Sequence, residues 1–232
     1  IKAAEGHNPR IQHLLIRRSR NIEIDGLNIT SNPKNNGETE DTALEIDAGK
    51  CSDWAGVTYD FADANITIKN SMIGSNGFTG VHATGCSGIN FENNIFNLIV
   101  NVPADKSDEE YSNIVGWGAS AKFFACKNIK FVRNNFMGAH PTLVWLQQSS
   151  NALFYNNVFW NTNEFDGECV AVRLCNQWKH NNNLAENIAF FYNTFYLADN
   201  DNNKQNYDFL QFKDDAGALK EETIYFQYNN CY

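Results

Sequence analysis

The chain has 232 residues, is 43% hydrophobic and 19% charged, and carries a formal net charge of −9 at pH 7. It contains no run of about 18 apolar residues, so the sequence predicts no membrane span. The acidic balance argues against a nucleic-acid partner, which would require a basic stripe, but a local basic cluster could still bind an anionic ligand. Asn occurs 35 times and Pro only four times. Because Asn tolerates the left-handed backbone region better than any residue except Gly, this composition predicts many tight turns.

A nine-residue pattern recurs along the chain in seven copies that align without gaps. In chain order the copies are Asn21–Ile29, Asn65–Ile73, Gly88–Phe96, Asn128–Phe136, Asn151–Phe159, Asn187–Phe195 and Thr223–Cys231. The second and fourth residues are small or apolar in every copy, which is the pattern of a strand with one buried face. The ninth residue is apolar in every copy, and the seventh is Asn in the last five.

A second short strand is predicted upstream of most copies, for example at His13–Ser19, Gly80–Cys86, Ala121–Cys126 and Thr142–Ser149. The two closest pairs of copies begin 23 residues apart, which is a typical length for one coil of a solenoid. Longer intervals between the other copies indicate loop insertions. Short strands, recurring turns and the absence of helical periodicity together predict an all-β fold. We expect a right-handed parallel β-helix of about seven coils, forming a single domain over residues 1–232.

The paired asparagines within the copies predict sharp corners between the strands of one coil. One left-handed residue makes such a bend, and the Asn amide can bond to the Asn of the coils above and below. We therefore expect an internal ladder of the seventh-position residues Asn94, Asn134, Asn157, Asn193 and Asn229. The repeated Phe positions predict buried stacks rather than sugar-binding platforms.

The copies at Ser19–Thr30 and Cys126–Phe136 resemble those of the pectate-lyase-like superfamily of right-handed β-helices. The resemblance covers nearly the whole chain and implies the fold rather than the function, because this fold hosts lyases, hydrolases, epimerases, adhesins and phage tailspikes. The catalytic segments of classical pectate lyases, polygalacturonases, chondroitinase B and alginate lyases are not recognisable. Neither end carries a capping segment, so we expect a β-helix that is incomplete at both ends and capped by missing segments or other subunits.

In this superfamily the substrate groove usually follows the upstream strand, so the outward positions of that strand are the candidate site. They are Glu45, Asp47, His82, Thr84, Lys122, Phe124, Trp145, Gln147, Arg173, Gln211 and Lys213. A plain solvated surface would show the same residue types, which is the competing interpretation. The combination of acids, a His–Lys pair, a Trp and an Arg favours the β-elimination of an acidic polysaccharide, which needs charge neutralisation, a base and a proton donor.

The resemblance also implies roles for these side chains. Lys122 is the candidate base, with Arg173 or His82 binding the substrate or protonating the leaving group. Trp145 is expected to stack on a sugar face, and the remaining substrate-binding candidates are Gln147, Glu45 and Asp47. Hydrolysis is the other enzymatic option, since it needs two carboxyl groups about 5–9.5 Å apart and Glu45 with Asp47 could provide them.

A calcium ion is a further expectation, because enzymes of this superfamily often use Ca²⁺ to neutralise the substrate carboxylate. Asp199 and Asp201 alternate with Asn203 like the start of an EF-hand loop, although Lys204 stands where Gly is required and no Glu closes the loop. A solvated loop is therefore the competing interpretation.

Cys86 and Cys126 share a repeat position in consecutive coils, which predicts either stacked buried thiols or a disulfide.

The sequence thus predicts a carbohydrate-active β-helix that is secreted, periplasmic or at the cell surface and acts on an acidic polysaccharide as a lyase or a hydrolase. The alternative is a non-catalytic adhesin, a tailspike-like fibre or a carbohydrate-binding module. The missing catalytic signatures favour the alternative, whereas the varied, bulky outward residues favour an enzyme.

Overall fold

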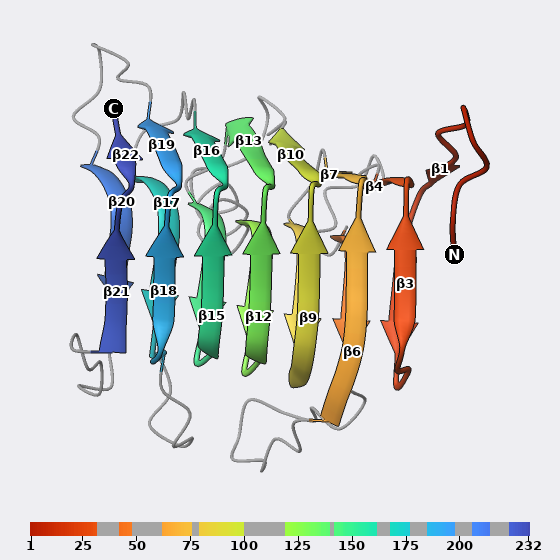
Figure 1. The fold of residues 1–232 in the computed structure, drawn as a ribbon, viewed down its shortest axis with the longest axis horizontal. Coiled ribbons are helices and arrows are strands. Elements are labelled where there is room, and N and C mark those ends of the chain that lie inside the picture. Colours follow the sequence, from red (N-terminus) through yellow and green to blue (C-terminus); the bar gives the residue numbers. More distant parts are fainter. Residues whose placement is uncertain are drawn as a thin grey trace, which may run out of the picture.

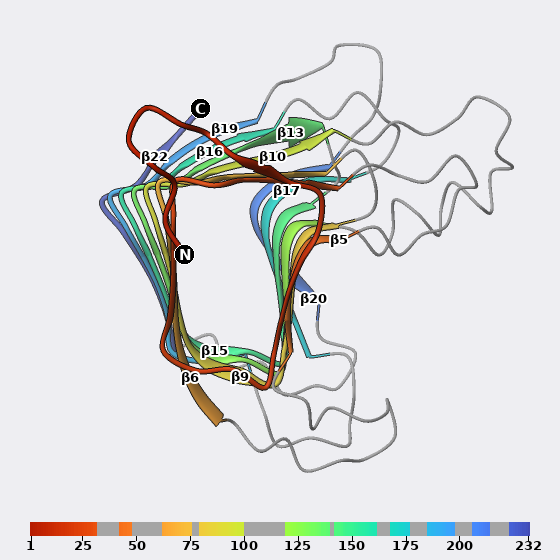
Figure 2. The same cartoon turned by 90° about the vertical axis from the view of Figure 1, so that its right-hand side faces the viewer.

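The computed structural model describes residues 1–31, 42–47, 62–75, 79–99, 119–139, 142–161, 168–176, 185–197, 206–213 and 223–232. These residues form a parallel β-helix of three sheets, in which strands far apart in the sequence lie side by side (Figure 1). Seen from the N-terminal end in Figure 2, the chain turns clockwise as it recedes, so the coil is right-handed. The predicted fold class is therefore confirmed.

Each coil contributes one strand to each sheet. Sheet A holds β3 (Ile22–Asp25), β6 (Ala62–Lys69), β9 (Cys86–Glu92), β12 (Lys127–Val132), β15 (Ser150–Tyr155), β18 (Ile188–Phe191) and β21 (Ile224–Gln227). Sheet B holds β1 (Arg10–Ile11), β4 (Asn28–Ser31), β7 (Met72–Ser75), β10 (Ile95–Ile99), β13 (Asn135–Ala139), β16 (Val158–Asn161), β19 (Thr194–Leu197) and β22 (Asn230–Cys231). Sheet C holds β2 (Leu14–Arg17), β5 (Thr42–Asp47), β8 (Thr79–Thr84), β11 (Ala119–Phe124), β14 (Thr142–Gln147), β17 (Glu168–Cys175) and β20 (Asn206–Lys213).

The nine-residue copies supply the strands of sheets A and B. The pairing register places Ile24 beside Ile68 and Ile68 beside Phe91, as the alignment of the copies requires. These fourth-position side chains are fully buried. Because one residue of slippage would turn every apolar side chain outward, the alternation of the copies fixes this register. The predicted repeat and its buried face are confirmed.

Two stacks of phenylalanine rings fill the core. In the first stack, the Phe131 and Phe154 ring centroids are 4.7 Å apart, and those of Phe154 and Phe190 are 4.6 Å apart. In the second stack, the corresponding distance between Phe136 and Phe159 is 4.8 Å. The spacing follows from the distance between paired strands, about 4.8 Å. The repeated Phe positions are therefore core, as predicted.

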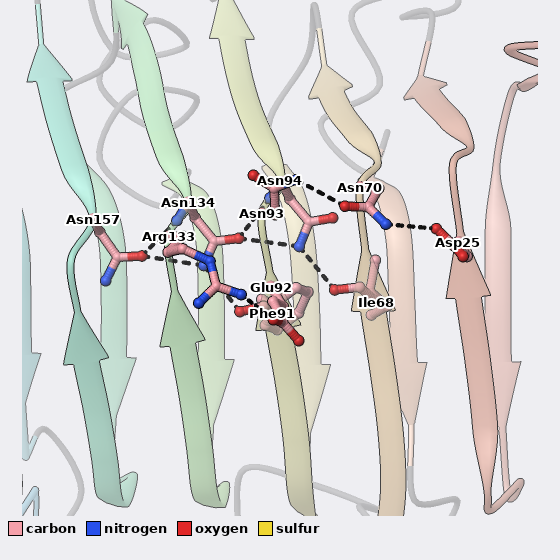
Figure 3. Close-up of polar contacts among 10 residues, drawn as sticks. All are labelled: Asp25, Ile68, Asn70, Phe91, Glu92, Asn93, Asn94, Arg133, Asn134 and Asn157. Atoms are coloured by element: carbon pink, nitrogen blue, oxygen red, sulfur yellow. Dashed lines mark hydrogen bonds and ion pairs between the residues drawn. The ribbon is translucent and has the colours of Figure 1, made fainter. Parts of the chain in front are cut away.

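The seventh-position asparagines form the predicted ladder at the corner between sheets A and B (Figure 3). The side-chain nitrogen of Asn94 donates to the side-chain oxygen of Asn134 at 3.0 Å, and Asn134 donates in the same way to Asn157 at 3.2 Å. The same bonds continue from Asn157 to Asn193 and from Asn193 to Asn229, each at 3.0 Å. Buried amides are thereby satisfied in consecutive coils.

The left-handed residue of this corner precedes the ladder residue. Its φ is 51° at Asn70, 56° at Asn93 and 54° at Asn156. The same sixth position of the repeat is occupied in the other coils by Gly26, Arg133, Tyr192 and Tyr228, all with positive φ. A residue other than Gly or Asn in this conformation costs about 1–2 kcal/mol. Arg and Tyr at this corner therefore disfavour the left-handed backbone conformation that the turn requires. We call this series the left-handed corner row.

A second series of asparagines, not predicted from the sequence, lies at the start of the copies. Asn21, Asn65, Asn128, Asn151 and Asn187 all have positive φ and exposed side chains. The side-chain nitrogen of Asn151 donates to the oxygen of Asn128, and that of Asn187 donates to Asn151, each at 3.2 Å. The recurrence of Asn at the first position of the repeat was the signal for this outer ladder.

The structure favours thiols over a disulfide at the two stacked cysteines. Cys86 and Cys126 are both buried thiols. The Cys86 Sγ lies 3.2 Å from the carbonyl oxygen of Thr84, and the Cys126 Sγ lies 3.4 Å from that of Phe124.

Among the described residues, no helix has the length and hydrophobicity needed to cross a membrane.

Candidate functional site

The outward positions of sheet C align the predicted site residues in one continuous row, as expected. Strand pairing places them in the order Glu45, His82, Lys122, Trp145, Arg173 and Gln211, one from each of β5, β8, β11, β14, β17 and β20. We call this set the outer row. The residues on either side of it along each strand, such as Val144 and Leu146, belong to the core. The outer row therefore lies on the face of sheet C that points away from the core.

A second row runs parallel to the first, two residues further along each strand. It consists of Asp47, Thr84, Phe124, Gln147, Cys175 and Lys213. Gln147 and Cys175 are buried, whereas Asp47 is half-buried. Gln147 therefore stands next to Trp145 on the same face of the sheet, as the sequence predicted, but its side chain is not open to solvent.

The centre of the outer row is a Trp with a cation at each side. The Nζ of Lys122 lies 4.2 Å from the centroid of the Trp145 ring, and the Cζ of Arg173 lies 5.0 Å from it. Both distances are within the range of a cation–π interaction. The three side chains are only 7%, 3% and 3% exposed, in chain order, so this part of sheet C is not a plain solvated surface. Stacking of a sugar on Trp145 stays a prediction, and it requires one cation to move aside.

The Arg173 side chain is fixed by hydrogen bonds within sheet C. Its Nε donates to the Oε1 of Gln211 at 2.6 Å, and the Nε2 of Gln211 donates to the Oδ2 of Asp208 at 3.2 Å. Two strands are thus linked through side chains as well as through the backbone. The bond orients the guanidinium group beside the Trp145 ring.

Burial and like charge shift the titration of two members of the outer row. The pKa of Lys122 is lowered to about 8, chiefly by burial, while Cys175 opposes the shift and Arg173 adds to it. Burial lowers the pKa of His82 to about 4, with a contribution from Lys122 in the same direction, while Asp47 acts in the opposite direction. His82 is therefore neutral near neutral pH, and a fraction of Lys122 is neutral as well.

The acidic end of the outer face is already paired with basic side chains of the preceding coil. The Nε2 of His13 lies 3.7 Å from a carboxylate oxygen of Glu45, and the Nε of Arg17 lies 2.9 Å from one of Asp47. Both carboxylates therefore take part in contacts within the β-helix. Their predicted roles in substrate binding or hydrolysis stay predictions.

The calcium prediction concerns Asp199 and Asp201, which lie outside the described residues. Within the described ranges, no group of three or more His, Cys, Asp and Glu side chains is placed to hold a metal ion. Glu45 and Asp47 share an outer face but have basic partners. Calcium binding therefore stays a prediction.

An exposed aromatic cluster at the corner between sheets A and B was missed by the sequence reasoning. It consists of Tyr155, Tyr192 and Tyr228, and we call it the aromatic corner. The rings of Tyr192 and Tyr228 stack at 5.2 Å with an interplanar angle of 10°, and Tyr155 meets Tyr192 edge to face at 5.7 Å. On sheet B, Trp160 meets Tyr196 edge to face at 6.1 Å. The signal was the appearance of aromatic residues at outward repeat positions, where no aromatic residue occurs in the first four copies.

Comparison with known proteins adds little beyond this geometry. No protein-family model matches the chain, and no curated protein sequence matches it. Among solved structures, the chain is similar to the Streptococcus pneumoniae surface protein and adhesin PfbA, with 12% sequence identity and a TM-score of 0.41. The match covers 96% of this chain and 64% of that chain. A similarity this weak carries no argument about function.

Proposed function

We propose that this β-helix binds an acidic polysaccharide along the outer row, as a secreted or surface-exposed glycan-binding protein. The observation that carries the proposal is the pair of cationic side chains, Lys122 and Arg173, buried beside one Trp ring. A buried lysine with a lowered pKa on the outward face of a sheet, beside an aromatic ring and a second cation, has the features of a functional site. The chain as a whole carries a net charge of −9, so the two cations are a local exception.

A polymer of uronic acids suits this row for geometric and electrostatic reasons. The row presents one side chain per coil, at a spacing of about 4.8 Å, and so forms a line across the coils. Lys122 and Arg173 are two coils apart, with Trp145 between them. Carboxylates on successive sugars supply the opposite charge.

The proposal is tested by titration calorimetry with polygalacturonate and alginate. Lys122→Met retains an unbranched side chain and removes the charge, and Arg173→Gln removes the guanidinium group. Each substitution is expected to weaken binding by roughly tenfold or more, because a charge-assisted contact is lost. Lys130→Met, on the exposed face of β12 in sheet A, is the matched control and should bind like the native protein.

Binding to these polymers should also weaken as salt is added, since ions screen the attraction. Native-like affinity in both outer-row variants, or no binding of either polymer by the native protein, would show the proposal to be wrong.

Cleavage of the same polymer by β-elimination is a second candidate function, favoured by one observation. The pKa of Lys122 is lowered to about 8, so near neutral pH part of the population has the neutral amine that proton abstraction needs. Arg173 would neutralise the substrate carboxylate, and His82 would interact with the substrate at the next coil. The test is the ultraviolet absorbance of the unsaturated product, with and without calcium. No product from pectate, alginate or glycosaminoglycans would exclude this candidate and leave the binding proposal intact.

A further inference from the structure

Two tyrosines occupy a backbone position where the fold favours Gly or Asn. Tyr192 and Tyr228 lie in the left-handed corner row with φ of 58° and 57°. Four other coils place less strained residues at this corner, namely Gly26, Asn70, Asn93 and Asn156. Arg133, the remaining member, forms an ion pair with Glu92 of the preceding coil, which gives its side chain a partner within the fold. The two tyrosines are therefore not explained by the requirements of the turn.

The same two side chains are also unusually exposed for aromatic residues. Tyr192 is 51% exposed although its ring touches those of Tyr155 and Tyr228. Trp160 and Tyr196 are exposed on the adjoining sheet B, again one ring per coil. Burying these rings inside the fold would be favourable, so an exposed cluster of them marks an interaction surface.

We propose that the aromatic corner binds a linear, neutral glycan that lies along the axis of the β-helix. The rings of Tyr155, Tyr192 and Tyr228 follow one another from coil to coil in a narrow line (coils as in Figure 1). Stable protein–protein interfaces bury about 800 Å² per partner around a broad apolar centre, whereas a narrow line of rings matches a chain-like ligand.

The surroundings of the rings favour a sugar that has no charge. Asn156 precedes Tyr192 in the left-handed corner row and has an exposed amide, which can donate to and accept from hydroxyl groups. The charged pair in this row, Arg133 with Glu92, is mutually neutralised. The aromatic corner lies between sheets A and B, across the β-helix from sheet C, so this site is separate from the outer row (Figure 2).

The test uses cellohexaose, xylohexaose and mannohexaose in titration calorimetry with the full chain. At least one of them should bind saturably to the native protein. Tyr192→Asn installs the residue that other coils use at this corner, so the variant should be at least as stable to heat as the native protein. It should nevertheless bind the oligosaccharide roughly tenfold more weakly, because a stacking ring is lost. Tyr192→Phe retains the ring and should stay within about threefold of the native affinity.

Glu23→Gln, on the same sheet but four coils away from Tyr155, is the control and should bind normally. Failure of all three oligosaccharides to bind, or native affinity in Tyr192→Asn, would overturn the proposal. If the native protein self-associates, Tyr192→Asn does not, and no oligosaccharide binds, the glycan proposal is wrong. The aromatic corner would then be an interface between two copies of this chain. Loss of polygalacturonate binding at the outer row has no bearing on this result, so the two sites are tested independently.

Discussion

The side-chain oxygen of Asn157 accepts two hydrogen bonds from Asn134 in the preceding coil, one from its backbone N–H at 2.8 Å and one from its side-chain nitrogen at 3.2 Å. The side-chain nitrogen of Asn157 in turn donates to the carbonyl oxygen of Phe131 at 3.0 Å and to Asn193 at 3.0 Å. Asn157 is buried, so water does not replace these partners. One amide thus satisfies polar groups of the two neighbouring coils, at a corner where the sheet ladders are interrupted.

Asn157→Ala should therefore destabilise the β-helix by about 3 kcal/mol. The substitution leaves two donors of Asn134 and the carbonyl of Phe131 without their partner, and each buried unsatisfied group costs about 1–3 kcal/mol. The free energy of unfolding is measured by urea denaturation.

Asn229→Ala is the matched comparison, because Asn229 occupies the same repeat position but is half-buried. Water can solvate the groups left by this substitution, so the expected loss is about 1 kcal/mol. Equal losses in the two variants would show that burial of the ladder does not set its contribution to stability.

Phe154→Ala should cost about 4 kcal/mol, since it opens a cavity in the middle of a ring stack. Phe154 lies between Phe131 and Phe190 and is fully buried. Phe226 occupies the same repeat position but is 40% exposed, so Phe226→Ala should cost clearly less. Urea denaturation of both variants checks the order, and a larger loss at Phe226 would contradict it.

The fold was predictable because its determinants are local and repeated. Alternation in each copy, as at Ile22 and Ile24, identifies the buried face, and Asn at the seventh position identifies the ladder. The assignment of left-handed φ to particular residues was not predictable, because Arg133 and Tyr192 adopt it although their own preferences oppose it. Coil-to-coil pairing of the whole β-helix overrides those preferences.

The candidate site was predictable only in part. The row of Lys122, Trp145 and Arg173 was predictable from the sequence. The position of a residue in the repeat determines both the face of the strand on which it lies and the residue with which it pairs. Their burial and the position of Trp145 between two cations did not follow from the sequence, because these depend on side-chain packing outside the core. The exposure of Tyr192 was not predicted, because only the repeated Phe positions of the copies were interpreted.

Lys122 should make the stability of the protein rise with pH in the alkaline range. Its pKa falls from 10.5 to about 8 on folding, so the folded protein binds fewer protons than the unfolded chain between these values. The contribution of Lys122 to stability is therefore lowest below about pH 8 and rises as the pH approaches 10.5, with a gain of about 2 kcal/mol between about pH 8 and pH 10.

The measurement compares native protein with Lys122→Met by urea denaturation at several pH values. His82 is neutral in both proteins throughout this alkaline range, so the difference between the two curves reports mainly on Lys122. Lys130→Met, which removes an exposed lysine, should follow the native curve. Parallel curves for the native protein and Lys122→Met would show that the Lys122 pKa is not lowered by folding.

His82 should produce the corresponding effect in the acidic range. Its pKa falls from 6.5 to about 4 on folding, so stability is highest above about pH 6.5 and decreases as the pH falls toward 4. The side chain is half-buried, which reduces the expected loss of stability to about 2 kcal/mol. His82→Gln should lack this pH-dependent loss.

Proton NMR titration of the imidazole gives the pKa of His82 directly. Because Lys122 contributes to the shift, Lys122→Met should raise the pKa of His82, whereas an unchanged value would show that the two side chains do not interact across the outer row.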